Sequence, residues 1–125
     1  FNNCCSPLIK NGWKKILSSL SLFPRFRCRK TIRMTLAKNA NMINPKKYAE
    51  ILSKVDADFF ELKAYMWVGY SRERLCQDNM PLHTEIVDFA EEICKNSDLK
   101  IISQKPESRV VLLMKKDRED RLMRF

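Results

Sequence analysis

The sequence predicts an α/β fold in which strands alternate with helices. Two kinds of periodicity lead to this prediction. Apolar residues recur every three or four positions in three segments, as in amphipathic helices, and alternate with other residues in two further segments, as in strands. The resulting order is helix, strand, helix, strand, helix, strand, strand. Strands that alternate with helices of this length are typical of βαβ units, so we expect a parallel sheet. The 125 residues fit one domain.

Three helices are expected from their apolar stripes. The first covers residues 8–22. The second begins at Asn44 and Pro45, with Asn as the N-cap and Pro at the first helical position. The third begins near Thr84, with Glu85 in the first turn, where the helix dipole favours an acid. The stripes are, in order, Ile9, Trp13, Ile16, Leu17 and Leu20; Tyr48, Ile51, Leu52 and Val55; and Ile86, Phe89, Ala90 and Ile93.

Four strands are expected, at residues 31–37, 58–65, 99–103 and 108–114, the last almost wholly apolar and therefore buried. In the first two, the face expected to pack against the helices carries Ile32, Met34, Leu36, Phe60, Leu62 and Ala64. The opposite face carries Arg33, Thr35, Glu61 and Lys63. That second face is either an exposed surface or an interior that carries function, and composition alone leaves both open.

Positive charge is concentrated in the N-terminal part of the chain. Residues 1–49 contain eleven Lys or Arg and no Asp or Glu, whereas residues 50–125 contain thirteen basic and fifteen acidic residues, so the net +9 is 11 − 2. Such an asymmetry attracts polyanions, and the phosphate backbone of a nucleic acid is the favoured partner. Ordinary solvation, or a nuclear-import-like patch at residues 24–33, is the alternative.

Cysteine spacing and hydropathy exclude several classes of protein. The five cysteines, at positions 4, 5, 28, 76 and 94, form no CxxC or CxxxCxxC motif, so we expect reduced thiols and no metal site. No apolar run is long enough to cross a bilayer, and lysines interrupt any signal-peptide-like segment. We therefore expect a cytoplasmic protein. The first residue is Phe1 and not Met, which suggests a piece of a longer protein.

Recognisable motifs extend over residues 30–114. In chain order they are RMTLAKNANM, KAYMWVGYSRERL, NMP, HTEIVDFA and ESRVVLL. They resemble the motifs of the tRNA 4-demethylwyosine synthases, the radical S-adenosylmethionine enzymes of wyosine biosynthesis, and GYSRERL with NMP is specific. One departure lies at residues 38–41, where this sequence has Lys-Asn-Ala-Asn and the family has Lys-Gly-x-Asn. Asn39 tolerates a left-handed backbone, so the turn is expected to survive.

The resemblance implies that the chain is the C-terminal half of a partial (βα) radical-SAM barrel with a C-terminal wyosine-forming segment. Residues 1–30 would then be a basic helix and linker, and residues 31–65 the C-terminal strands of the barrel. Residues 66–114 would be the wyosine-forming, tRNA-binding segment, and residues 115–125 a charged tail that is either an extra helical turn or disordered.

The resemblance also implies the chemistry. Members of this family condense N1-methylguanosine of phenylalanine tRNA, beside the anticodon, with a two-carbon unit of pyruvate in a lyase-type reaction. They use S-adenosylmethionine and a [4Fe–4S] cluster, and an upstream flavodoxin-like domain would add FMN. This sequence lacks the cluster motif, so we expect the isolated chain to be inactive and to need the N-terminal part of the same enzyme. A non-catalytic RNA-binding module derived from the family is the alternative.

Lys63 is the predicted catalytic residue. It follows Glu61 at the carboxyl end of a strand, where the chemistry of βα-barrels is located. Its amine is expected to contact pyruvate, either by holding the carboxylate or by forming a Schiff base with the ketone. A structural ion pair between Glu61 and Lys63 is the alternative, and no covalent role is assigned.

Ten further residues are expected to bind substrate or tRNA because they lie at strand ends or in the loops that follow. They are Lys38, Asn41, Glu61, Tyr70, Ser71, Arg72, Arg74, Asn79, His83 and Arg109. The two arginines of GYSRERL match phosphate geometry, and Ser71 adds a hydroxyl. Tyr70 is expected to stack on an unpaired base, whereas Trp67 is expected to pack under the loop.

The remaining site residues have more than one interpretation. Lys38 and Asn41 are expected to face S-adenosylmethionine or substrate. Asn79 is expected to fix the loop before the third helix. His83, placed just ahead of the helix N-cap, contacts phosphate or base, or is a local structural partner. Arg109 reaches RNA or the acidic helix.

Overall fold

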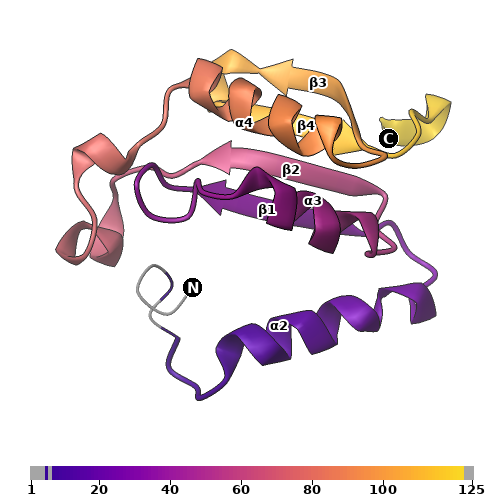
Figure 1. Ribbon diagram of the computed structural model, residues 1–125, viewed down its shortest axis with the longest axis horizontal. Helices are drawn as coiled ribbons and strands as arrows, with labels where there is room; N and C mark the ends of the chain where they lie inside the picture. The colour runs from indigo at the N-terminus through magenta and orange to yellow at the C-terminus, as the bar shows by residue number, and fades with distance from the viewer. Residues whose placement is uncertain (1–4, 6, 123–125) are drawn as a thin grey trace.

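A four-stranded mixed sheet forms the centre of the molecule, and helices α3 and α4 cover one of its faces (Figure 1). The computed structural model describes Cys5 and residues 7–122. Residues 1–4 and 6 of the expected N-terminal basic segment, and residues 123–125 of the expected tail, lie outside the described residues. The elements are α2 (Gly12–Ser21), β1 (Thr31–Leu36), α3 (Pro45–Ser53), β2 (Phe59–Ala64), α4 (His83–Lys95), β3 (Lys100–Lys105) and β4 (Val110–Met114).

The element order matches the sequence prediction, but the expectation of a parallel sheet is wrong for the C-terminal half. The strand order is β1-β2-β4-β3. Strands β1 and β2 are parallel, whereas β4 runs antiparallel to both β2 and β3. The reason is the connection between β3 and β4, which contains only the short 3₁₀ turn Pro106–Ser108 and the residue after it. A parallel pair needs a crossover connection of a dozen or more residues. A connection as short as this one therefore gives an antiparallel hairpin.

The predicted apolar face of the first two strands is confirmed. Leu36, Phe60, Leu62 and Ala64 are buried in the core cluster, and Ile32 and Met34 pack against it. Residues of α3, α4, β4 and the connections after the two helices complete this cluster, namely Ala49, Leu52, Val55, Ile86, Phe89, Ala90, Ile93, Leu99, Val111 and Leu113. The ring of Tyr48 on α3 meets that of Phe89 on α4 edge to face, with centroids 5.4 Å apart. The core therefore lies between the sheet and the helix pair.

The predicted stripe of the first helix is not buried as expected. Of its members, only Leu20 packs against the core, whereas Ile9 lies before the helix and is half-exposed. Ile16 and Leu17 also remain substantially exposed. Helix α2 lies apart from the sheet, alongside α3 (Figure 1). Helical spacing shows that one face of a helix is apolar, but it does not show how much of that face the neighbouring elements cover.

Two helix starts differ from the prediction. Asn44 precedes Pro45 at the N-cap of α3, but its backbone is left-handed (φ 52°) and its side chain makes no capping hydrogen bond. His83 is the first residue of α4 and does not precede the N-cap, which is Leu82. The Glu85 carboxylate accepts a hydrogen bond from the Leu82 backbone N–H at 2.8 Å. This contact satisfies a backbone donor at the start of the helix.

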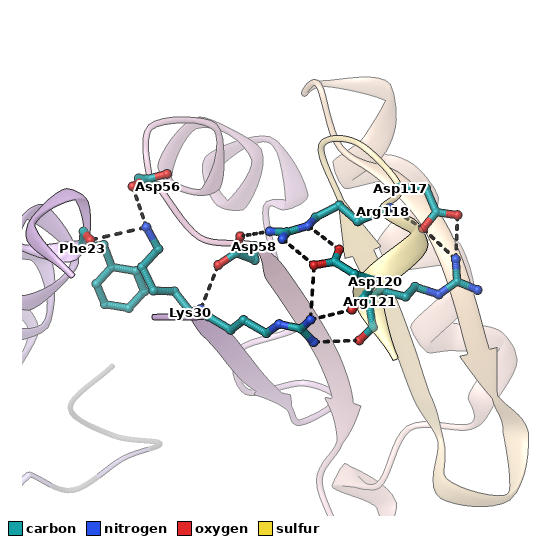
Figure 2. Close-up of polar contacts among 9 residues, drawn as sticks. Phe23, Lys30, Asp56, Asp58, Asp117, Arg118, Asp120 and Arg121 are labelled. Carbon is teal, nitrogen blue, oxygen red and sulfur yellow. Dashed lines mark hydrogen bonds and ion pairs between the residues drawn. The ribbon is translucent and has the colours of Figure 1, made fainter. Parts of the chain in front are cut away.

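A network of charged side chains joins the C-terminal tail to the amino ends of β1 and β2 (Figure 2). Lys30 pairs with Asp56 at 2.6 Å, and Arg118 pairs with Asp58 at 2.8 Å. Arg29 pairs with Asp120 at 3.3 Å. The tail was expected to form a helical turn or to be disordered, and it contains the 3₁₀ turn Glu119–Arg121. The two pairs made by tail residues lie at the surface and contribute at most about 1 kcal/mol each, so they mainly fix the position of the tail.

Within the part of the chain that the structure describes, every helix is too short or too polar to pass through a lipid bilayer.

Candidate functional site

The carboxyl ends of β1 and β2 and the start of β4 meet at one edge of the sheet, here called the carboxyl edge (at the left in Figure 1). The Ala64 N–H donates to the Arg109 carbonyl at 3.0 Å, which joins the end of β2 to the start of β4. The Tyr65 N–H donates to the Leu36 carbonyl at 2.8 Å, which joins the ends of β2 and β1. The loop of residues 66–82 begins here. The predicted site residues Lys38 and Arg109 therefore lie at the same edge as this loop.

Asn79 fastens the loop to the end of β1. Its side-chain Nδ2 donates to the Lys38 carbonyl at 2.7 Å, and its backbone carbonyl accepts from the Lys38 N–H at 2.9 Å. Its Oδ1 accepts from the Cys76 N–H at 2.9 Å. The expectation that this asparagine fixes the loop agrees with these contacts. Because both ends of its amide are occupied within the chain, Asn79 is placed to position the loop.

An open hollow of about 440 Å³ lies beside Asn79, and its charged lining residues are Lys38, Asp78, Glu85 and Arg109. Lys38 Nζ lies 2.5 Å from Glu85 Oε1. The hydrogen bond from Lys38, together with that from the Leu82 N–H, holds the pKa of the Glu85 carboxyl below its ordinary value. Arg109 Nη1 donates to the Pro81 carbonyl at 3.2 Å. Two cations and two carboxylates thus line the hollow, which is close to neutral overall.

The GYSRERL segment forms the 3₁₀ turn Gly69–Glu73 and projects two arginines into solvent. Gly69 has φ 58°, a left-handed conformation that glycine adopts without strain. The guanidinium of Arg72 lies 4.4 Å from the centre of the Trp67 ring, and Trp67 Nε1 donates to the Leu75 carbonyl at 2.8 Å. Trp67 therefore packs under the loop, as expected, and supports Arg72 from below.

Tyr70 and Ser71 lie on the same turn but differ in exposure. The side chain of Tyr70 is 82% exposed and available to a partner. The Ser71 hydroxyl donates to the Val68 carbonyl at 2.6 Å and is hydrogen-bonded to the Tyr65 hydroxyl at 2.9 Å. Ser71 was predicted to offer its hydroxyl to substrate or tRNA, yet that group already closes the turn. Of these two residues, Tyr70 is thus the one whose side chain is available to contact a partner molecule.

The face of the sheet opposite α3 and α4, here called the open face, carries Lys63. The expected alternative, an ion pair between Glu61 and Lys63, is not formed. Glu61 pairs with Arg33 on β1 at 2.6 Å, because the parallel register places these two residues directly opposite each other. Lys63 lies between Thr35 and Val110 in the register and is half-buried. Within residues 7–122 its side-chain ammonium has no hydrogen-bond or ion-pair partner.

Two predicted binding residues are used inside the fold. Asn41 closes the turn after β1, because its Oδ1 accepts from the Ala37 N–H at 2.7 Å and its Nδ2 donates to the Thr35 carbonyl at 2.8 Å. Asn39 in this turn has φ 58°, which confirms the expected left-handed backbone. His83 Nε2 lies 2.9 Å from Gln104 Oε1, so the histidine anchors α4 to β3. Of the two interpretations of His83, this contact supports the one in which the histidine is a local structural partner.

Similarity to known proteins identifies the chain. A family model described as wyosine base formation matches residues 54–115. The S-adenosyl-L-methionine-dependent tRNA 4-demethylwyosine synthase of Pyrococcus horikoshii is 44% identical over 118 residues. The chain belongs to the tRNA 4-demethylwyosine synthase family. The synthase of Methanocaldococcus jannaschii is 37% identical and that of Schizosaccharomyces pombe 31% identical, over 88% and 76% of this chain.

The chain spans about a third of the length of its archaeal relatives in this synthase family. It covers 34% of the Pyrococcus horikoshii protein and 35% of the Methanocaldococcus jannaschii protein, and it matches their C-terminal portion. The alignment with the Pyrococcus horikoshii protein includes 94% of this chain.

Solved structures of the synthase family share the fold. A structure of TYW1 with a lysine–pyruvate adduct bound superimposes with a TM-score of 0.75 at 34% identity, covering 88% of this chain and 35% of that chain. A crystal structure of archaeal TYW1 superimposes with a TM-score of 0.68 at 32% identity, covering 86% of this chain and 33% of that chain. These similarities confirm the family that the sequence motifs indicated.

Sequence reasoning missed two residues of the site. Glu85 was expected only as a favourable acid in the first helical turn, yet it also pairs with Lys38 in the hollow. Arg33 was assigned to the open face without a role, yet it is the partner of Glu61. The alternation along the strand placed Arg33 on the same face as Glu61. Pairing the two residues also requires the register between the two strands, which periodicity alone does not determine.

Proposed function

We propose that this chain is the substrate- and tRNA-positioning part of a tRNA 4-demethylwyosine synthase. The reaction of the whole enzyme is then the lyase-type condensation of N1-methylguanosine of phenylalanine tRNA with a two-carbon unit of pyruvate. The observation that carries this proposal is the carboxyl edge. There the GYSRERL loop, with Tyr70, Arg72 and Arg74 exposed, lies beside the strand ends that hold Lys38 and Lys63.

In this proposal, residues 31–65 contribute strands to a partial barrel and the open face forms part of its interior. The parallel pair β1 and β2 fits a barrel segment, and their carboxyl ends are where barrel enzymes bind substrate. Residues 66–114 form the wyosine-forming segment. Residues 1–30 and the tail flank these two parts.

We propose that Lys63 contacts pyruvate. Its amine is half-buried on the open face, and Glu61 does not neutralise it because Arg33 holds that carboxylate. One solved relative is TYW1 with a lysine–pyruvate adduct bound, which supports pyruvate as the ligand proposed here. A lysine ammonium is a natural partner for the pyruvate carboxylate. The role assigned to Lys63 is this ionic contact.

The described residues do not fit an iron–sulfur cluster. Among Cys5 and residues 7–122, no three His, Cys, Asp or Glu side chains lie close enough together to hold a metal ion. The thiols of Cys28, Cys76 and Cys94 are free and widely separated in sequence. We therefore assign no step through the cluster to this chain. In this proposal the N-terminal part of the enzyme carries out the radical chemistry and binds S-adenosylmethionine and any FMN. We also propose that the enzyme acts in the cytoplasm.

The RNA-facing loop is tested by replacing both of its exposed arginines. In the complete protein, Arg72→Ala/Arg74→Ala is expected to weaken binding of phenylalanine tRNA. It should also lower the slope of log affinity against log salt by about 1.4, since each lost phosphate contact in single-stranded RNA contributes about 0.7. The measurement is a titration of fluorescent tRNA at several salt concentrations.

A matched control for this double variant is Lys95→Ala/Lys100→Ala. These two lysines are exposed and lie at the end of the sheet opposite the carboxyl edge. The control removes the same net charge, so it is expected to retain most of the wild-type affinity and slope. Equal affinities and equal slopes for wild type and the arginine variant would contradict the role of the loop in RNA binding.

A further inference from the structure

Two rows of side chains cross the open face of the sheet. The pairing register defines them, because residues directly opposite each other on neighbouring strands share a face. The row nearest the carboxyl edge contains Thr35, Lys63, Val110 and Lys105. The next row contains Arg33, Glu61, Leu112 and Ser103. The assignment of Lys105 to this face is supported by its neighbour Gln104, which points to the helix side and contacts His83 on α4.

The two rows differ in charge balance. In the second row the Arg33–Glu61 pair is neutral and its atoms are 2.6 Å apart. The first row carries two lysines and no acid. Lys105 is exposed and, as for Lys63, its side-chain ammonium has no hydrogen-bond or ion-pair partner within the described residues. The row of the open face nearest the carboxyl edge therefore carries a net positive charge.

The distance between the two lysines favours an extended anion. Neighbouring strands lie about 4.8 Å apart, so Lys63 on β2 and Lys105 on β3, with β4 between them, are about 10 Å apart at their Cα atoms. Pyruvate, with a single carboxylate, needs only one of them. A polynucleotide carries a phosphate on every residue, and lysine is a common point-charge partner for such phosphates.

We propose that Lys105 is a further phosphate-contact residue for the tRNA. It would extend the RNA-binding surface from the GYSRERL loop across to the β3–β4 hairpin, and hold the RNA backbone about 10 Å from the pyruvate contact at Lys63. This inference rests on the proposed function, because it assumes that the carboxyl edge faces tRNA. It adds a residue outside the recognised motifs and outside the ten predicted binding residues.

The test compares two lysines of the same strand and the same face. Lys105 lies at the carboxyl edge, and Lys100, opposite Met114, lies at the other end of β3, roughly 17 Å away. In the complete protein, Lys105→Ala is expected to lower the affinity for phenylalanine tRNA about fivefold at moderate salt and to reduce the salt slope by about 0.7, with the pyruvate KM unchanged. Lys100→Ala is expected to leave the affinity, the slope and the KM at their wild-type values.

The outcomes separate this inference from the proposed function. If Lys105→Ala binds tRNA with wild-type affinity and slope while Arg72→Ala/Arg74→Ala does not, the inference is wrong and the proposed function stands. If both variants bind as wild type does, the proposed RNA surface is wrong as well. A raised pyruvate KM for Lys105→Ala with an unchanged salt slope would also overturn the inference, because Lys105 would then contact the small substrate.

Discussion

Replacing Lys63 by Met is expected to lower kcat/KM for pyruvate about 100-fold in the complete enzyme. The loss corresponds to about 2.7 kcal/mol, within the range of a hydrogen bond to a charged group. Met is similar to Lys in length and lacks the ammonium, so the half-buried position between Thr35 and Val110 stays filled. The measurement is the rate of product formation on phenylalanine tRNA at varied pyruvate concentration.

Two control variants test whether the loss of activity comes from removing the ammonium of Lys63. Lys63→Arg keeps the positive charge and is expected to retain more activity than Lys63→Met. Lys100→Met makes the same substitution on the same face but at the far end of β3, and is expected to behave as wild type. Full turnover of Lys63→Met at low pyruvate concentration would remove this lysine from the mechanism.

Phe60→Ala is expected to destabilise the fold by about 4 kcal/mol, the usual cost of removing a fully buried aromatic side chain. Phe60 is 0% exposed and lies on β2, which pairs with strands on both sides. A loss of this size is a large share of the 5–15 kcal/mol that typically stabilises a folded protein. Denaturant unfolding of the complete protein, followed by far-UV circular dichroism, measures the change.

The neighbouring residue provides the control for this prediction. Phe59 has the same side chain on the same strand but points to the open face and is only partly buried. Phe59→Ala is therefore expected to cost about 1 kcal/mol, because less apolar surface is returned to water. Equal destabilisation by the two variants would mean that the core does not lie on the helix side of the sheet.

The two faces of β1 and β2 could be predicted because their information is local. Alternation along each strand places Phe60 and Leu62 on one face and Glu61 and Lys63 on the other, and the structure follows it. The direction of β4 could not be predicted from periodicity, because an antiparallel strand alternates in the same way as a parallel one. The short connection after β3 was the signal that determined it.

The site was predictable in its location more than in its contacts. Lys38 and Arg109 are at strand ends in the sequence, and the sheet brings both to the carboxyl edge. Asn41 and His83 have the same kinds of positions, but the Asn41 amide and the Nε2 atom of His83 bond within the fold. The same residue type can close a turn or bind a ligand. Only the observed hydrogen-bond partners show which of these two roles a side chain has.

Amide hydrogen exchange of the complete protein, with and without phenylalanine tRNA, tests most directly whether the carboxyl edge faces the substrate RNA. We expect tRNA to slow exchange in residues 38–41, 69–79 and 105–109, which lie at this edge. We expect no change in residues 54–58 and 95–100, which lie at the opposite end of the sheet. Protection of the opposite end, with the loop of residues 69–79 unaffected, would contradict the placement of the tRNA at the carboxyl edge.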